Sequence, residues 1–240
     1  MTSRIRILGI GVALVGLVFV AAGAFAFIQA QAGAASLQAY SAKQNVKLTY
    51  NAQGQLTSAG TTKEADGIMS LLVNDWKYPV NKADLNPNDP IVNTASEYMF
   101  QMAMINYHIL HGTQTVVLTA DAKAADGSTV PAGTYTFPVD GKYYADFNRA
   151  NPIEGAARGQ AWSATALGLI AELGVGTTTA SAIQLAMAVA GLIAGIGLLA
   201  LMTGLGLVWA SRAPIALPSE VRSPTFVATP GVLPAPVSPR

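Results

Sequence analysis

Two histidines, His108 and His111, are the residues of this chain best placed for metal chemistry, and they are its only histidines. A separation of three residues puts both imidazoles on one side of a helix, where ring nitrogens can bind a metal ion. A catalytic zinc site usually needs three protein ligands, and the neighbouring sequence offers no third. Positive charge is also favoured at the C-terminal end of a helix, which explains the pair without a metal. We therefore predict no metal site and keep His108 and His111 as weak candidate ligands.

Other catalytic groups are scarce in the sequence. The chain has no cysteine, which rules out disulfides, thiolate metal sites and a cysteine nucleophile. It has no G-x-S-x-G, H-E-x-x-H or G-x-x-x-x-G-K-[ST] motif. Four aspartates recur in similar contexts, and a pair of them could hold a cation or transfer protons, but such residues are also typical of turns and helix caps. They are Asp66, Asp84, Asp126 and Asp146. The sequence predicts a protein that is not an enzyme, with no catalytic residue and no cofactor.

Two long uncharged stretches must position the rest of the chain. The 240 residues are 51% hydrophobic and only 11% charged, whereas a soluble domain carries about 25% charged residues. Residues 7–28 contain no charge, and residues 183–209 have Gln184 and Thr203 as their clearly polar side chains. Each stretch is long enough for a hydrocarbon layer of roughly 30 Å, in which a helix satisfies its own backbone hydrogen bonds. We predict two transmembrane α-helices in contact with the lipid bilayer.

The placement of positive charge predicts the orientation of the helices. Two arginines precede the first stretch and three follow the second, against one acid, while residues 30–182 hold nine Lys/Arg and twelve Asp/Glu. Positive flanks stay in the cytoplasm. We therefore expect a bacterial plasma-membrane protein with residues 1–6 and 210–240 inside and residues 30–182 outside. The net charge of +1 gives no basic face for a nucleic-acid partner.

A cleaved signal sequence is the alternative for the first stretch. Arginines before an apolar run, followed by Ala30-Gln31-Ala32, are similar to a secretory signal with an A-x-A cleavage site. The apolar run is longer than the 7–15 residues typical of such a signal. We favour a retained helix, although cleavage after Ala32 would leave the same domain outside, held by one span.

Small residues spaced four apart occur in both spans. Gly191 and Gly195 form a G-x-x-x-G pattern, and Gly9 and Ala13 share that spacing. Small residues one turn apart let helix backbones approach closely. They predict helix packing, either between the two spans, which we favour, or with a membrane-protein partner or a second copy of the chain.

The middle of the chain contains an internal repeat. Residues 46–112 and 116–174 run through the same order of signals: a β-prone run, a turn, an aromatic extended run and a helix opened by proline. The matching segments are 46–49 with 116–119, 63–67 with 123–127, 76–81 with 135–140, 83–86 with 145–148, and 90–95 with 152–157. Helices are expected to begin at Pro90 and Pro152 and to end near Gly112 and Gly174. We predict an α+β domain of two tandem strand-turn-helix units, joined to the first span by a linker at residues 29–45.

The last segment is rich in proline. Residues 213–240 contain seven prolines and little that could form a core, so we expect a disordered, partly polyproline-II cytoplasmic tail. Pro236 and Pro239 match the spacing of a ligand for proline-reading modules, but a simple solvated tail explains them as well.

One stretch resembles a known family. Residues 144–152 (YADFNRANP) and the helix after them, between two glycine- and alanine-rich spans, are similar to a family of two-span membrane proteins of Gram-positive, actinobacterial type with one extracytoplasmic domain. Many members carry the label of aromatic ring-opening dioxygenase. A non-haem iron site needs two histidines and a carboxylate presented together, and the sequence gives that activity no support.

Two functions remain. The first is a non-enzymatic accessory or scaffolding subunit that presents its outer domain to a partner membrane complex. The alternative is an extracytoplasmic ligand-binding or sensor module, with a cleft in the outer domain and a signalling tail inside.

Overall fold

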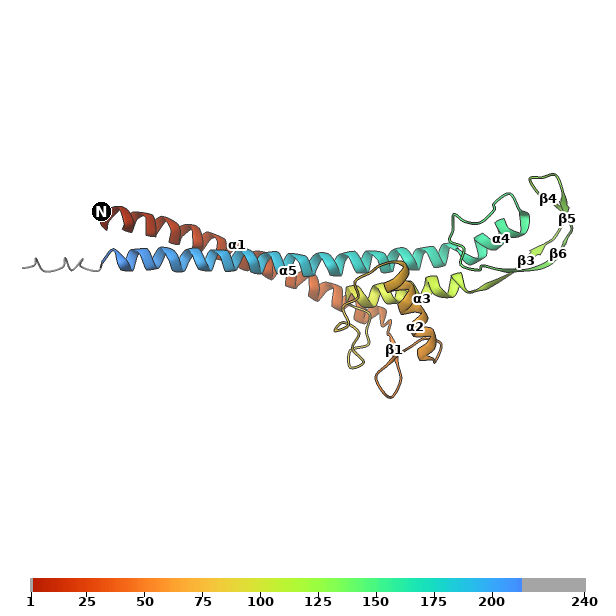
Figure 1. The fold of residues 1–240 in the computed structure, drawn as a ribbon, viewed down its shortest axis with the longest axis horizontal. Coiled ribbons are helices and arrows are strands. Elements are labelled where there is room, and N and C mark those ends of the chain that lie inside the picture. The colour runs from red at the N-terminus through yellow and green to blue at the C-terminus, as the bar shows by residue number, and fades with distance from the viewer. Residues whose placement is uncertain (1, 213–240) are drawn as a thin grey trace, which may run out of the picture.

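Two long helices organise the computed structural model, which describes residues 2–212 (Figure 1). α1 (Thr2–Gln44) and α5 (Ala164–Ala210) lie antiparallel and pack along most of their length. Both are long and apolar enough to cross a membrane. Their paired part, residues 2–33 and 180–210, is called the shaft below. The predicted proline-rich tail, with Pro236 and Pro239, lies outside the described residues.

Both helices are longer than the sequence predicted. Residues 29–44 belong to α1, so the predicted linker at 29–45 is wrong. The predicted helix end at Gly174 is also wrong, because α5 runs through Gly174 and Gly176 without interruption. The threonines after them fit the helix, since the Thr177 hydroxyl donates to the Leu173 carbonyl. The chain breaks earlier, at Trp162, and the Ser163 hydroxyl then caps α5 by accepting from the Ala166 N–H.

The shaft is held by glycines spaced seven residues apart. A Cβ added at Gly16 would lie 2.4 Å from the Leu201 nitrogen and 2.7 Å from the Gly197 carbonyl oxygen. The contacts repeat along both helices at Gly9, Gly16 and Gly23 of α1 and at Gly204, Gly197 and Ala190 of α5. Backbone therefore touches backbone, and a seven-residue repeat keeps this contact on one face of each helix.

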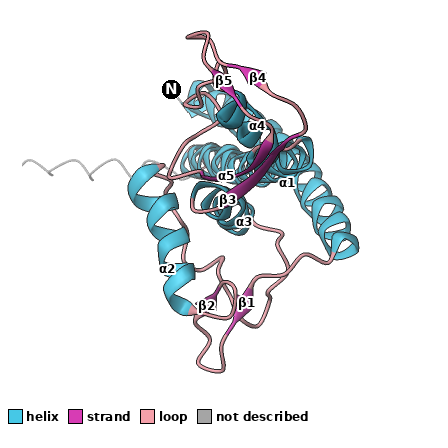
Figure 2. Cartoon of the chain, turned by 90° about the vertical axis from the view of Figure 1, so that its right-hand side faces the viewer, coloured by secondary structure: helices cyan, strands magenta, loops and turns pink. Residues whose placement is uncertain are grey.

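The outer region, residues 45–163, has two hydrophobic cores. The first lies among α2 (Thr62–Ser70), its π-helical extension η1 (Leu71–Asp75) and α3 (Ala95–Leu110), beside the N-terminal third of α5. The second lies under α4 (Pro152–Ala161) and the ribbon of β3 (Thr113–Leu118) and β6 (Gly133–Pro138). Two further antiparallel pairs are β1 (Thr49–Tyr50) with β2 (Leu56–Thr57) and β4 (Ala122–Lys123) with β5 (Thr129–Val130) (Figure 2).

The structure does not confirm the internal repeat, which stays a prediction. Residues 65–67, predicted as a turn, lie inside α2, whereas the matching residues 125–127 form a turn with Gly127 at φ 82°. The helix of the first predicted unit is α3, which begins at Ala95 with Thr94 as its N-cap, so the predicted start at Pro90 is wrong. The helix of the second predicted unit is α4, which begins at Pro152 with Asn151 as its N-cap, as expected.

A buried carboxylate closes the start of α3. Glu97 is 1% exposed, and its Oε2 accepts from the backbone N–H groups of Asn93 and Thr94 and from the Thr94 hydroxyl. The Thr94 hydroxyl accepts in turn from the Glu97 N–H, which completes a capping box. Burial outweighs these hydrogen bonds and raises the pKa of Glu97 above its usual value.

A Glu97→Gln variant is expected to flatten part of the pH dependence of stability. Because the folded pKa lies above the unfolded one, the folded chain holds a proton more tightly, and its stability falls as pH rises from about 4.5 through the folded pKa. The measurement is the unfolding midpoint in detergent at a series of pH values, wild type against variant. A wild-type midpoint that climbs relative to the variant over this range would contradict the assignment.

Candidate functional site

A cavity of about 560 Å³ lies where α1, α3 and α5 meet, beyond the end of the shaft. Its walls are mainly apolar side chains from three separate stretches of the chain. They include Leu37, Val46, Val92, Ile105, Leu169 and Leu173. Small-molecule sites in proteins are concave, mostly apolar and about 300–1,000 Å³ in volume, with a few polar groups that set orientation. This cavity has the size and lining of such a site.

Tyr98 fixes the three helices around the cavity. Its hydroxyl and the Ser41 hydroxyl share a buried hydrogen bond of 2.6 Å, which joins α3 to α1. Its ring lies on the backbone of α5 at Gly176, where an added Cβ would be 2.7 Å from the ring carbons. A glycine is needed at this crossing, since any side chain would push α3 away from α5. The cavity wall therefore depends on one buried tyrosine and one glycine.

A short chain of hydrogen bonds crosses from α1 to α5 at the cavity. The Tyr40 hydroxyl donates to Glu172 Oε1 at 2.9 Å, and Gln44 Nε2 donates to the Tyr40 oxygen at 2.8 Å. All three side chains line the cavity and are exposed. Glu172 is the single charged residue in the 47 residues of α5. A lone carboxylate on so apolar a helix is a signal that sequence reasoning could have used.

An amide oxygen on a residue that lines the cavity lacks a partner. Gln101 Oε1, on α3, is buried, and none of the described residues donates a hydrogen bond to it. An unpaired buried acceptor costs roughly 1–3 kcal/mol. A molecule that donated a hydroxyl or N–H group to this oxygen, after a turn of the Gln101 side chain toward the cavity, would remove this cost.

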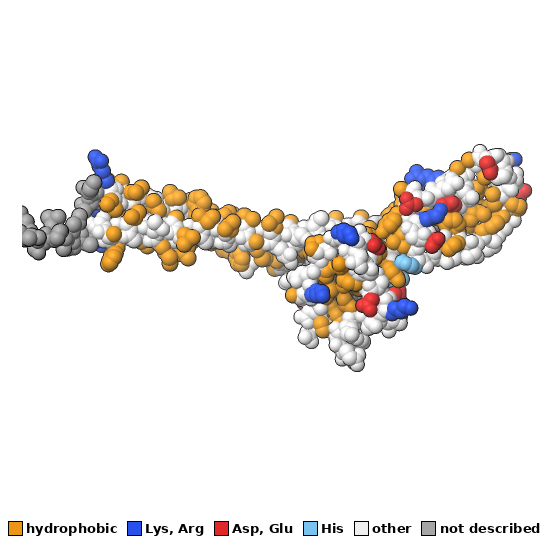
Figure 3. Space-filling model, in the orientation of Figure 1, with side chains coloured by type: hydrophobic (Ala, Val, Ile, Leu, Met, Phe, Trp, Pro, Cys, Tyr) orange, Lys and Arg blue, Asp and Glu red, His pale blue; other side chains and the backbone are white. Residues whose placement is uncertain are grey.

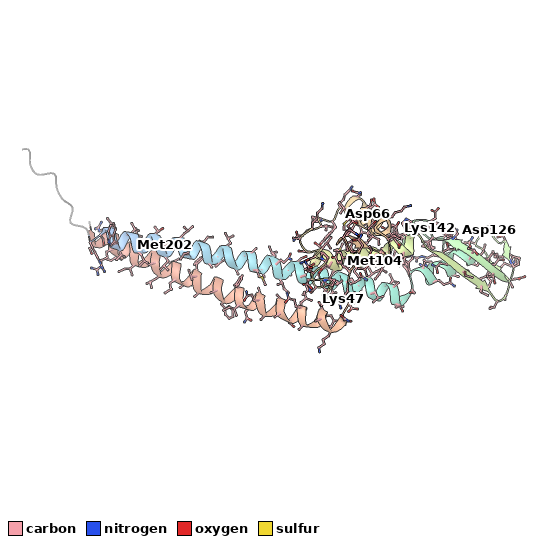
Figure 4. All side chains as sticks on the ribbon, turned by 90° about the horizontal axis from the view of Figure 1, so that it is seen from below. Lys47, Asp66, Met104, Asp126, Lys142 and Met202 are labelled. Carbon is pink, nitrogen blue, oxygen red and sulfur yellow. The ribbon has the colours of Figure 1, made fainter. Side chains whose placement is uncertain are left out.

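The two histidines do not form a shared site. His108 Nε2 pairs with Glu64 Oε1 of α2, whereas His111 Nδ1 contacts the Tyr107 carbonyl at 2.8 Å and its ring packs on the Tyr107 ring. Within residues 2–212, no three His, Cys, Asp or Glu side chains are grouped as metal ligands. Two of the four aspartates, Asp66 and Asp126, do not form a carboxylate pair, because Asp66 lies on α2 and Asp126 in the distant β4–β5 turn (Figure 4).

The structure separates the four small residues singled out for helix packing. Gly9 and Ala13 lie against α5 at Gly204, where an added Cβ would be 2.5 Å from the Gly9 oxygen and 2.4 Å from the Ala13 nitrogen. Gly191 and Gly195 face away from α1, with no other described part of the chain within 4 Å of an added Cβ. The four-residue pattern missed Gly16, Gly23 and Gly197, which a search at seven-residue spacing would have found.

Two long apolar helices that could span a membrane, joined to a small sheet-containing region with a cavity at the junction, define the class: an antiparallel helix pair that carries a small sheet-containing region. Comparisons with known proteins found no relative of this chain. No protein-family model matches the chain, and no match was found among curated proteins or solved structures. The resemblance of residues 144–152 to the two-span family therefore stays a prediction.

Proposed function

We propose that this protein is a membrane-anchored binding module, with a cavity above the bilayer that takes an apolar small molecule. The shaft crosses a bacterial plasma membrane, both termini lie in the cytoplasm, and the outer region faces the exterior. The cavity carries the proposal, because it combines a volume of about 560 Å³, mostly apolar walls and the unpaired Gln101 oxygen. This is the second of the two functions that the sequence left open.

The distribution of side chains supports the membrane placement. Large apolar side chains are exposed along both helices of the shaft, including Leu14 (58%), Phe25 (65%) and Leu199 (68%). Figure 3 shows hydrophobic side chains along the shaft, positive ones at its free end and charges of both signs over the outer region. A surface this apolar is stable in lipid and unfavourable in water.

Filling the cavity is expected to weaken binding of an apolar fluorescent probe, N-phenyl-1-naphthylamine, to the full chain in lipid nanodiscs. Leu169 lines the cavity from α5 and is 45% exposed, so Leu169→Trp places a large ring at its wall. We expect saturable binding by the wild type, above that of empty nanodiscs, and at least a tenfold loss of affinity in the variant.

Leu167→Trp is the matched control, since Leu167 lies two residues away on the same helix, is 40% exposed and does not line the cavity. Its probe affinity should equal that of the wild type, and non-specific partitioning of the probe into the lipid should be the same for both variants. Equal binding by the two tryptophan variants, or none by the wild type above empty nanodiscs, would refute the binding-module proposal.

The accessory-subunit function keeps one specific observation in its favour. Gly191 and Gly195 form a small-residue face of α5 that α1 does not cover, flanked by the exposed Leu192 and Ile196. A partner helix in the membrane could pack closely there. On this proposal, Gly191→Ile would lose proteins that co-purify with the wild type in mild detergent, whereas Gly11→Ile, at another open glycine, would keep them.

A further inference from the structure

We infer that the cavity selects a single-chain amphiphile whose head group is a neutral or cationic hydrogen-bond donor, and excludes an anionic head group. The inference rests on the proposed binding function and adds the chemical class of the ligand. It follows from two oxygen acceptors on residues that line the cavity and, above all, from the sign of the charge beside them.

Two residues that line the cavity carry oxygen acceptors without a hydrogen-bond donor. The Tyr40 hydrogen is already donated to Glu172, and the Gln44 amide donates to the Tyr40 oxygen. The two oxygens are the buried Gln101 Oε1 and the second oxygen of the Glu172 carboxylate. A head group that supplies hydrogens, as a hydroxyl or an amine does, can pair with these oxygens.

The charge at the cavity is negative. Among the described residues that line it, Glu172 is the single charged one. Lys43 and Lys47 are close in sequence to lining residues but do not line the cavity themselves. A carboxylate or phosphate head group would therefore meet a like charge with no cation among the lining residues, whereas an ammonium would gain a charge-assisted hydrogen bond.

The rest of the cavity suits a hydrocarbon chain. Leu169 and Val175, 45% and 65% exposed, form an apolar lip on α5, and the interior continues between Leu37, Val92 and Ile105. Both side chains lie outside the shaft and so face water. Covering them with the hydrocarbon chain of a ligand removes apolar surface from water, which is favourable. An amphiphile buries its chain against these walls and leaves its head group beside Glu172 and Gln101.

The test compares three ligands that share one chain: decylamine, decanol and decanoate, each competing with N-phenyl-1-naphthylamine on the full chain in nanodiscs. Competitor concentrations are corrected for partitioning into empty nanodiscs. We expect decylamine to displace the probe at least tenfold better than decanoate, with decanol between them. Equal displacement by all three would overturn the inference while leaving the binding function intact, whereas displacement by none would count against both.

A Glu172→Gln variant identifies the residue responsible. Glutamine keeps an acceptor for the Tyr40 hydroxyl but removes the charge, so decylamine should lose its advantage over decanol and decanoate should bind better by about tenfold. Glu64→Gln, a carboxylate that pairs with His108 outside the cavity, is the matched control and should leave the order unchanged. An unchanged order in Glu172→Gln would overturn the assignment.

Discussion

A Gly16→Ile variant is expected to force α1 away from α5 and to lower the stability of the shaft by about 3 kcal/mol or more, at the upper end of the cost of overpacking. The reason is that the nearest atoms are backbone. The new Cβ would lie 2.4 Å from the Leu201 nitrogen and 2.8 Å from its Cα, and neither can rotate out of the way as a side chain can. In lipid, helix association depends on close packing rather than on a hydrophobic driving force, so the lost contact is not replaced.

Gly195→Ile is the matched control, because an added Cβ there meets nothing within 4 Å. Thermal unfolding midpoints in one mild detergent would be compared for the wild type and the two variants. A midpoint near the wild type for Gly195→Ile and a large decrease for Gly16→Ile is the expected pattern. The same comparison tests the signal-sequence alternative, since a chain cleaved after Ala32 lacks Gly16 and would be insensitive to both changes.

The two apolar helices were the part of the fold that the sequence predicted best. Residues 7–28 and 183–209 lie in α1 and α5, because an uncharged run of that length has few alternatives to a helix. The ends of these helices could not be predicted from composition in the same way. Residues 29–44 continue α1 because they pack beside α3 and α5, with Ser41 bonded to Tyr98, and that tertiary contact is not visible in the local sequence.

The break between the last two helices was misplaced for a related reason. Two glycines and three threonines at 174–179 are common helix breakers, yet Gly176 is required by the Tyr98 ring that packs on it. The true break follows Trp162, which is buried in the second core and whose indole N–H donates to the Lys142 carbonyl at 3.3 Å. Packing of a single large side chain decided the position.

The cavity could not be predicted from the sequence, because its walls come from three stretches at residues 37–46, 92–105 and 169–179. Histidines and aspartates are the residues familiar in catalysis, whereas the polar groups of the cavity include Tyr40, Gln101 and Glu172. Only Glu172 carried a visible signal. A glutamine or a tyrosine is unremarkable in sequence until its neighbours are known.

Truncating Phe100 to alanine is expected to unfold the first core of the outer region while leaving the shaft paired. Phe100 is fully buried, at 0% exposure, among Ile68, Leu72 and Ala103, where α2 and α3 pack together. Removing a buried aromatic ring costs about 3–5 kcal/mol, because the neighbours collapse only partly into the space. With no cysteine in the chain, no disulfide limits the opening.

The two parts of the molecule respond differently because different forces hold them. The outer cores depend on burial away from water, whereas the shaft depends on backbone contact at Gly9, Gly16 and Gly23. Chymotrypsin added to nanodisc-embedded Phe100→Ala should therefore cut within the outer region at least tenfold faster than in the wild type, and the shaft helices should survive digestion as lipid-protected fragments. Phe25→Ala, which trims a side chain 65% exposed on α1, should digest at the wild-type rate. Equal rates for the two phenylalanine variants would mean that the outer region does not depend on this core.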